Sequence, residues 1–219
     1  REVIAPAGSL EKALVEGRID SVTYRKAMQK QMPGWWTRAT TVGGITGVPP
    51  GRTAQITHRL HPGEYVLTCL LKTPNHRTHA FLGVRAGLTV TEASSDAAPP
   101  EADVVARVSE RTFEVDTSAL GEQQTVAFRA VNTADPGPSP GVGLFRLTDD
   151  TGTKKILDWM RSGLPLPAPT QWLGGPAPMM AGNRAFVRVG DLSPGRYAWI
   201  SIRAPKTSGM VKRFTVENE

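Results

Sequence analysis

Residues 62–69 read PGEYVLTC, and residues 194–201 repeat this stretch as PGRYAWIS. The Pro-Gly pair favours a turn, and the alternation of large apolar residues after it is typical of a half-buried β-strand. The same turn and strand occurring twice indicate two copies of one domain, in which Tyr65 and Tyr197 occupy equivalent, largely buried positions.

The repeat extends well beyond these eight residues. Further matching segments keep the same order in both copies: 43–44 with 174–175, 51–56 with 182–187, 83–84 with 209–210 and 88–90 with 214–216. The period of about 130 residues is too long for a solenoid unit. We therefore predict tandem domains at residues 1–91 and 104–219, joined by an Ala/Ser/Pro-rich linker at residues 92–103.

The composition favours a mainly β protein. The 22 glycines and 18 prolines suit short strands joined by turns, and 39% of the residues are hydrophobic. Cys69 is the single cysteine, so an internal disulfide is excluded. No apolar run approaches the roughly 18 residues of a membrane-spanning helix, so no membrane span is expected.

Positive charge is concentrated in the first domain. Residues 1–91 carry 12 Lys plus Arg against 5 Asp plus Glu, and residues 92–219 carry 14 against 15, so that +7 and −1 give the net +6. The basic first domain could meet an anionic surface or an acidic protein. Its basic residues are scattered and accompany no nucleic-acid-binding motif, so no nucleic acid partner is expected.

Along the first copy, the pattern predicts a strand at residues 2–5 and a helical hairpin over residues 9–17 and 22–32. Trp35 and Trp36 follow, either as a sugar- or partner-binding platform or as core residues, and their lone counterpart Trp172 favours core packing. Residues 51–60 and 64–71 are expected to form a hairpin. Residues 81–91 form the last strand.

Along the second copy, the same analysis predicts one helix over residues 153–160 and several strands. The strands are expected at residues 104–115, 123–132, 144–147, 184–189, 196–202 and 211–216. The two strands within residues 104–132 have no counterpart before Arg1. Either upstream residues supply them, or another chain completes the first domain beside residues 3–5.

With these motifs in place, the chain resembles the bacterial cupredoxin-like proteins. The resemblance implies two tandem cupredoxin-like Greek-key β-sandwiches with short helical insertions. Copper-binding cupredoxins hold the metal with two His, one Cys thiolate and a distant Met. Cys69 matches the Cys, His79 the second His and Val84 the Met, but no His matches the first His, which would fall near Arg1.

In the second copy, the Cys position holds Ser201, the Met position holds Met210, and no His is present. The resemblance therefore implies that the copper ligands are largely lost, and we expect no cofactor and no metal site. The alternative is a copper site in the first domain that uses Cys69, His79 and His76.

Catalysis is not expected from the sequence. Cys69 and His79 could act as nucleophile and base, but no third, orienting residue is evident. Phosphate-binding loops, paired carboxylates and zinc-finger spacings are absent from the sequence. We therefore expect a non-catalytic structural or interaction protein, secreted or in the cell envelope, that binds a protein partner or itself through the incomplete first domain. The alternative is a copper carrier or electron-transfer protein. The extracytoplasmic location rests on the resemblance and on the linker composition.

Overall fold

The computed structural model describes most of the chain from residue 39 onward. The described ranges are 39–74, 78–92, 97–109, 112–121, 124–130, 138–162, 164, 166–190, 192–202 and 210–217. The predicted strand at residues 2–5, the predicted helices over 9–17 and 22–32, Trp35, Trp36 and His76 lie outside these ranges.

The described part of the chain is built mainly of strands. In chain order the elements are β1 (Gln55–His58), β2 (Gly63–Thr68), the 3-10 helix η2 (His79–Leu82), β3 (Arg85–Val90), β4 (Val104–Val108), β5 (Phe113–Glu114), the 3-10 helix η3 (Thr117–Ala119), β6 (Gln124–Ala130), β7 (Val142–Leu147), α3 (Thr153–Arg161), β8 (Arg184–Val189), β9 (Gly195–Ser201) and β10 (Val211–Val216). The predicted mainly β fold is confirmed. Among the described residues, no helix is long and apolar enough to cross a membrane.

The contacts divide the chain into two compact units. One contains residues 64–89, and the other contains residues 41–63, 90–160 and 168–219. We call them the hairpin unit and the sandwich unit.

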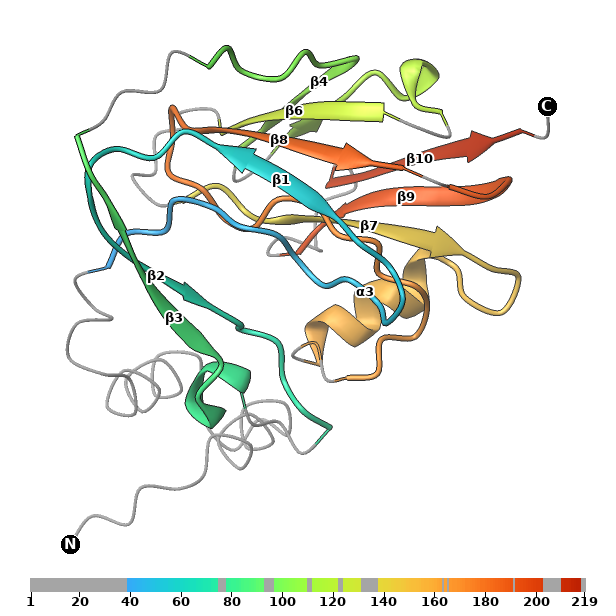
Figure 1. The fold of residues 1–219 in the computed structure, drawn as a ribbon. Coiled ribbons are helices and arrows are strands. Elements are labelled where there is room, and N and C mark those ends of the chain that lie inside the picture. Colours follow the sequence, from blue (N-terminus) through green and yellow to red (C-terminus); the bar gives the residue numbers. More distant parts are fainter. Residues whose placement is uncertain are drawn as a thin grey trace, which may run out of the picture. The chain divides into compact units, whose positions relative to one another are not determined.

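The sandwich unit consists of two sheets. One has the strand order β1-β8-β6-β4-β5 and the other has the order β10-β9-β7 (Figure 1). The β4 and β6 strands are parallel, whereas the other neighbours are antiparallel. The chain passes from the first sheet to β7, returns to β8, and crosses again to β9 and β10. These crossings make a Greek-key type of β-sandwich, as predicted for the second copy.

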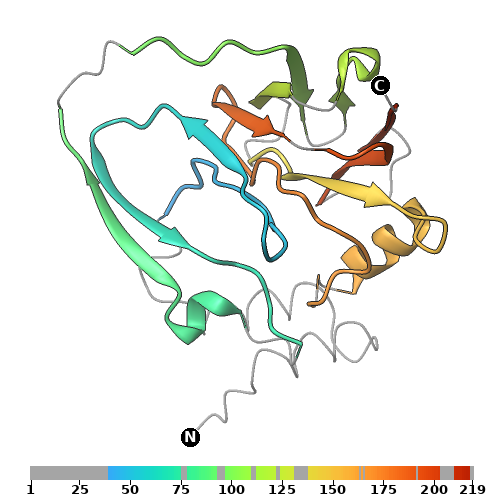
Figure 2. The same ribbon diagram turned by 45° about the vertical axis from the view of Figure 1, so that its right-hand side comes forward.

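Aromatic side chains from both sheets meet in the core. Phe128 of β6 and Trp199 of β9 are fully buried, with ring centroids 5.1 Å apart in an edge-to-face arrangement. On β4, buried and exposed residues alternate, as expected for a sheet with one face in the core. The β7 strand is buried on both faces. Its Phe145 contacts Trp159 of α3. The α3 helix follows β7 in the chain (Figure 2).

The other strands predicted for the second copy are confirmed, and so is the helix predicted over 153–160. The single strand predicted over 104–115 is wrong, because the chain forms two antiparallel strands there, β4 and β5, and Ser109 N–H donates to the Thr112 carbonyl between them at 2.8 Å. Trp172 also takes the predicted core role, because it is 6% exposed and stacks on Phe145 with ring centroids 5.5 Å apart. Periodicity and turn residues therefore placed most of the elements of this copy, but they did not reveal the reversal between β4 and β5.

The predicted hairpin between residues 51–60 and 64–71 is wrong. Instead, β1 pairs with β8, while β2 pairs with β3. The repeat-equivalent strands β8 and β9 also belong to different sheets. The sequence could not distinguish the two pairings, because a Pro-Gly turn that connects two sheets has the same composition as a hairpin turn. Pairing with β8 also lets Ile56 of β1 pack against the core of the sandwich unit. The predicted tandem boundaries, 1–91 and 104–219, stay a prediction.

The β1–β8 pairing joins equivalent residues of the two copies. Ile56 corresponds to Val187 in the repeat, and these two residues lie directly opposite each other in the antiparallel pair. An antiparallel pair that matches equivalent residues has a local two-fold axis at that point. The copies therefore meet symmetrically along this edge.

A second pair of segments follows the same symmetry. Thr46 N–H donates to the Gly175 carbonyl at 2.8 Å, and Ala177 N–H donates to the Gly44 carbonyl at 2.9 Å. Since Gly44 corresponds to Gly175 and Thr46 to Ala177, these two hydrogen bonds are equivalent in the two copies. Both glycines have positive φ, 134° and 127°, which supports the register of the repeat.

Candidate functional site

The lone cysteine lies at the point where β2 ends. Cys69 N–H donates to the Val84 carbonyl at 3.2 Å, and the Cys69 carbonyl accepts from Ala80 N–H at 2.9 Å. These backbone bonds hold the end of β2 beside the residue that precedes β3. Cys69 and Val84, which the resemblance matched to the Cys and Met of cupredoxins, are therefore neighbours.

His79 completes this corner of the hairpin unit. It begins η2, its N–H donates to the Leu71 carbonyl at 2.9 Å, and its carbonyl accepts from Val84 N–H at 3.1 Å. The Cys69 Sγ and His79 Nδ1 atoms lie 3.5 Å apart, which is hydrogen-bond distance for sulfur. The structure thus brings together Cys69, His79 and Val84, whereas His76 lies outside the described residues.

A thiol and an imidazole at this distance could form a nucleophile and base or supply two soft metal ligands. Either role needs a further group: an orienting partner for the His, or a third ligand. Within the described ranges, His79 has no side-chain hydrogen bond other than the one to Cys69, and no group of three or more His, Cys, Asp or Glu could hold a metal. The metal ligands predicted for the alternative stay a prediction.

His58 has a structural role in the sandwich unit. Its Nε2 accepts from Gly44 N–H at 3.0 Å, and its ring packs against Gly43. Burial lowers the pKa of the His58 imidazole below its usual 6.5, and a hydrogen bond to the Arg184 backbone opposes this effect. The neutral imidazole of His58 therefore stabilises the backbone at residues 43–44.

The positions of the second copy that match copper ligands lie in the core. Ser201 and Met210 are fully buried. Within the described residues, Ser201 Oγ has no hydrogen-bond partner. A buried serine and methionine without an imidazole do not make a copper site.

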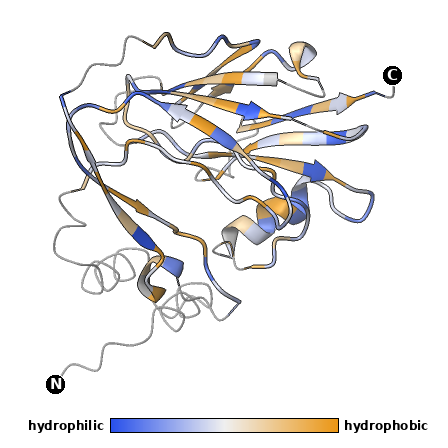
Figure 3. Cartoon of the chain, in the orientation of Figure 1, coloured by the Kyte–Doolittle hydropathy of each residue, from blue (hydrophilic) through white to orange (hydrophobic). Residues whose placement is uncertain are grey.

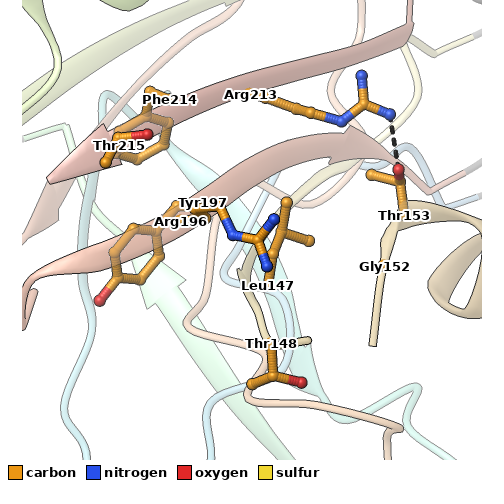
Figure 4. A pocket seen from close by; sticks show the side chains of 9 residues that line it. All are labelled: Leu147, Thr148, Gly152, Thr153, Arg196, Tyr197, Arg213, Phe214 and Thr215. Atoms are coloured by element: carbon orange, nitrogen blue, oxygen red, sulfur yellow. Dashed lines mark hydrogen bonds between the residues drawn. The ribbon is translucent and has the colours of Figure 1, made fainter. Parts of the chain in front are cut away.

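A hollow of about 340 Å³ lies beside the start of α3 (Figure 4). Its lining residues are Leu147, Thr148, Gly152, Thr153, Arg196, Tyr197, Arg213, Phe214 and Thr215. Arg196 pairs with Asp149 at 2.6 Å, and Arg213 donates to Thr153 Oγ1 at 2.6 Å. Both guanidinium groups thus have partners on the chain itself, and the hollow offers no acid–base pair for catalysis.

One side of the hairpin unit carries an apolar face that no motif in the sequence identified. By strand alternation, Tyr65, Leu67 and Cys69 share one face of β2. Leu67 is 61% exposed, and on the β3 side Val84 and Leu88 are 51% and 39% exposed. Figure 3 shows the corresponding apolar stretches of β2 and β3 in orange.

The equivalent residues of the second copy provide an internal reference. Trp199, the counterpart of Leu67, is 0% exposed, and Phe214, the counterpart of Leu88, is 8% exposed. In the sandwich unit the other sheet covers this face, as the Phe128–Trp199 contact shows. On the same face of the hairpin unit, Leu67, Val84 and Leu88 are exposed. The signal in the sequence was the repeat itself, because Tyr65 and Leu67 of β2 match the core residues Tyr197 and Trp199.

Several solved structures are similar to this chain. Auracyanin B has 18% identity and a TM-score of 0.40, with 57% of this chain and 96% of that chain covered. The auracyanin of the photosynthetic bacterium Roseiflexus castenholzii has 16% identity and a TM-score of 0.39, covering 52% of this chain and 95% of that chain. A multi-copper oxidase from Pediococcus acidilactici has 12% identity and a TM-score of 0.32, with 60% of this chain and only 30% of that chain covered.

No protein-family model and no curated protein matches the chain. The similarities to the solved structures are too low to carry a functional argument. The β-sandwich itself follows from the strand order and from the core that the two sheets share.

Proposed function

We propose that this chain is a non-catalytic, extracytoplasmic structural or interaction protein that works as an assembly subunit. A protein partner, or a second copy of the chain, covers the open face of the hairpin unit. The observation that carries the proposal is the difference between Leu67, 61% exposed, and its buried counterpart Trp199.

An uncovered two-stranded sheet is unfavourable in water. An isolated pair of strands is marginally stable at best, and a third strand or a packed layer normally completes it. Each Leu or Val side chain that becomes buried contributes about 1.5–3 kcal/mol. Six of the eight large hydrophobic residues exposed in the described chain belong to the hairpin unit: Val66, Leu67, Leu70, Leu82, Val84 and Leu88.

The edge of β1 indicates where a partner strand could add. In the second copy, β8 lies between β6 and β1, so both of its edges are paired. The equivalent strand β1 pairs with β8 on one edge, and no described strand pairs with its other edge. A strand in the position that β6 has beside β8 would extend the five-stranded sheet.

The non-catalytic part of the proposal rests on the Cys69–His79 corner, which has a thiol and an imidazole but no orienting group among the described residues. The extracytoplasmic part rests on the resemblance to cupredoxin-like proteins and on the composition of the linker at residues 92–103.

The size of the assembly as a function of concentration tests the proposal. We expect the purified chain to self-associate, or to form a defined complex with its natural partner, and Leu67→Ser with Leu88→Ser to abolish the association. Val66→Ser is the matched control, because Val66 is 45% exposed but lies on the opposite face of β2.

Two results would reject the proposal. One is a chain that stays monomeric at all concentrations and is also a free monomer when isolated from its source. The other is equal loss of association in the control variant, which would show that the face containing Leu67 is not the contact.

The contact between Cys69 Sγ and His79 Nδ1 supports the alternative, a copper carrier or electron-transfer protein that uses Cys69, His79 and His76. Copper titration separates the two functions. Near-stoichiometric copper with an intense thiolate-to-copper band that disappears in Cys69→Ala would favour the alternative. A weaker site formed by the two histidines would show no such band.

A further inference from the structure

The outer face of the larger sheet carries arginines on three neighbouring strands. On β4, the residues Val104, Ala106 and Val108 point into the core, so Val105 and Arg107 point outward. The same alternation places Arg129 of β6 and the arginines of β8 on that outer face.

The strand register places three of these arginines in one row. Arg107 is paired with Arg129, and Arg129 is paired with Arg184. Arg188 lies on the same face of β8, four residues from Arg184. Between them, Phe186 is paired with Ala127 and gives the face a small apolar centre.

Among the described residues, no ion pair neutralises the arginines of this row. Like charges directly opposite each other on neighbouring strands are destabilising. Within the described residues, the side chains of Arg107, Arg129, Arg184 and Arg188 form no ion pair or hydrogen bond, and Arg129 Nε is buried without a partner. The carboxylate nearest in register is that of Glu114, paired with Arg107 on the edge strand β5. A sheet face that gathers unpaired guanidinium groups is suited to an anionic ligand.

We propose that this arginine face, defined by Arg107, Arg129, Arg184 and Arg188, binds a linear acidic polysaccharide. The four cations are spread over three strands of an open sheet, so one small anion cannot reach all of them. Guanidinium groups suit planar carboxylates, to which they can donate two parallel hydrogen bonds.

The spacing of the row favours a polysaccharide over other polyanions. Neighbouring strands lie about 4.7–4.9 Å apart, and the arginines of the row repeat at this interval across the strands. Side chains on one face of an extended peptide repeat every 6.6 Å or so, which does not match the row. Single-stranded nucleic acid is usually held by several stacked aromatic rings, whereas Phe186 is the one aromatic residue among the strand residues described on this face.

The inference is independent of the proposed assembly role, because it concerns another surface. It also places a basic surface outside residues 1–91, where the net charge had predicted one. Residues 92–219 carry a net charge of −1, but strand pairing gathers several arginines of the second copy on one face.

Binding of polygalacturonate to the full chain tests the inference. We expect saturable binding that weakens as salt is raised, because Arg107, Arg184 and Arg188 are exposed. Combining Arg107→Ser, Arg184→Ser and Arg188→Ser should weaken binding by about tenfold or more, because each contact is a charge-assisted hydrogen bond.

The control removes the same charge from other elements: Lys154→Ser and Lys155→Ser on α3 with Arg213→Ser on β10. These residues are exposed, and the variant should bind within about twofold of the wild type, since its arginine face is intact. Circular dichroism shows whether both variants are folded. If the arginine variant does not fold, the single change Arg184→Lys, which keeps the charge but loses the planar fork, should still weaken binding.

Three outcomes overturn the inference: no binding of polygalacturonate, equal loss in both triple variants, or tighter binding of an oligo-dT or poly-L-glutamate probe. The last outcome would identify the face as a site for nucleic acid or for an acidic polypeptide instead.

Discussion

Replacing Tyr197 by Ala should be among the most destabilising single changes in the sandwich unit. The ring is 1% exposed and stacks on Phe214 with centroids 5.5 Å apart, and its hydroxyl donates to the Ser193 carbonyl at 2.5 Å. Emptying a large buried aromatic site costs about 3–5 kcal/mol of unfolding free energy. Tyr197→Phe removes the hydroxyl alone and should cost about 1 kcal/mol, because exposed Ser193 can bond to water instead.

Tyr65→Ala is the matched comparison. The sequence predicted that the two tyrosines are equivalent and largely buried, and burial is confirmed for Tyr197, whereas Tyr65 is only half-buried. In the free chain we therefore expect Tyr65→Ala to cost about 1–2 kcal/mol, less than a fully emptied core site.

Urea unfolding, followed by tryptophan fluorescence, measures both costs. With a slope of about 3 kcal/mol/M, a loss of 3–5 kcal/mol lowers the midpoint by about 1.0–1.7 M. Equal losses for Tyr65→Ala and Tyr197→Ala in the free chain would contradict the assignment of one open and one covered face. A loss below about 1 kcal/mol for Tyr197→Ala would contradict the sandwich core itself.

Three further predictions concern the sandwich unit. Burial depresses the pKa of His58 in the folded state, so the unfolded chain takes up the proton first as the pH falls. The free energy of unfolding should be constant above pH 7 and fall below pH 6.5, and urea titrations of His58→Gln should show a weaker dependence on pH. Gly175→Ala would place its Cβ 2.1 Å from the Val142 carbonyl oxygen and should lower the free energy of unfolding by about 3 kcal/mol or more. Gly182→Ala is also at positive φ but has open space around it, so it should cost about 1–2 kcal/mol. Similar thermal midpoints for the two variants would show that the close approach at Gly175 is absent. Ser201→Ala removes a buried hydroxyl that has no partner among the described residues and should leave stability unchanged or raise it by up to about 1 kcal/mol, and a clear loss in urea unfolding would indicate that the hydroxyl has a partner.

Local patterns predicted the second copy well because its signals are short-range. Strand alternation located β8, β9 and β10, and the polar start and apolar spacing at residue 153 located α3. The resemblance matched Cys69, His79 and Val84 to ligand positions of one site, and the structure brings these residues together, since two strands and the loop between them are enough to do so.

The pairing partners could not be predicted in the same way. An alternating pattern indicates which side chains face inward, but it carries no information on the neighbouring strand. The β1 strand pairs with β8, about 130 residues further along the chain, rather than with β2. The arginine face depends on this kind of information, because Arg107, Arg129 and Arg184 are far apart in sequence and become neighbours only through register.

The symmetric contact between the two copies has a consequence for how it is maintained. Four residues of β1 and the doubled hydrogen bond at Gly44 and Gly175 make a short contact, of the kind that two separate chains would hold only weakly. When both partners belong to one polypeptide, the contact forms at a high effective concentration and needs little intrinsic affinity. Because the copies are covalently connected, each can change its own surface while the contact between β1 and β8 is kept. The apolar face of one copy and the arginine face of the other are such surfaces.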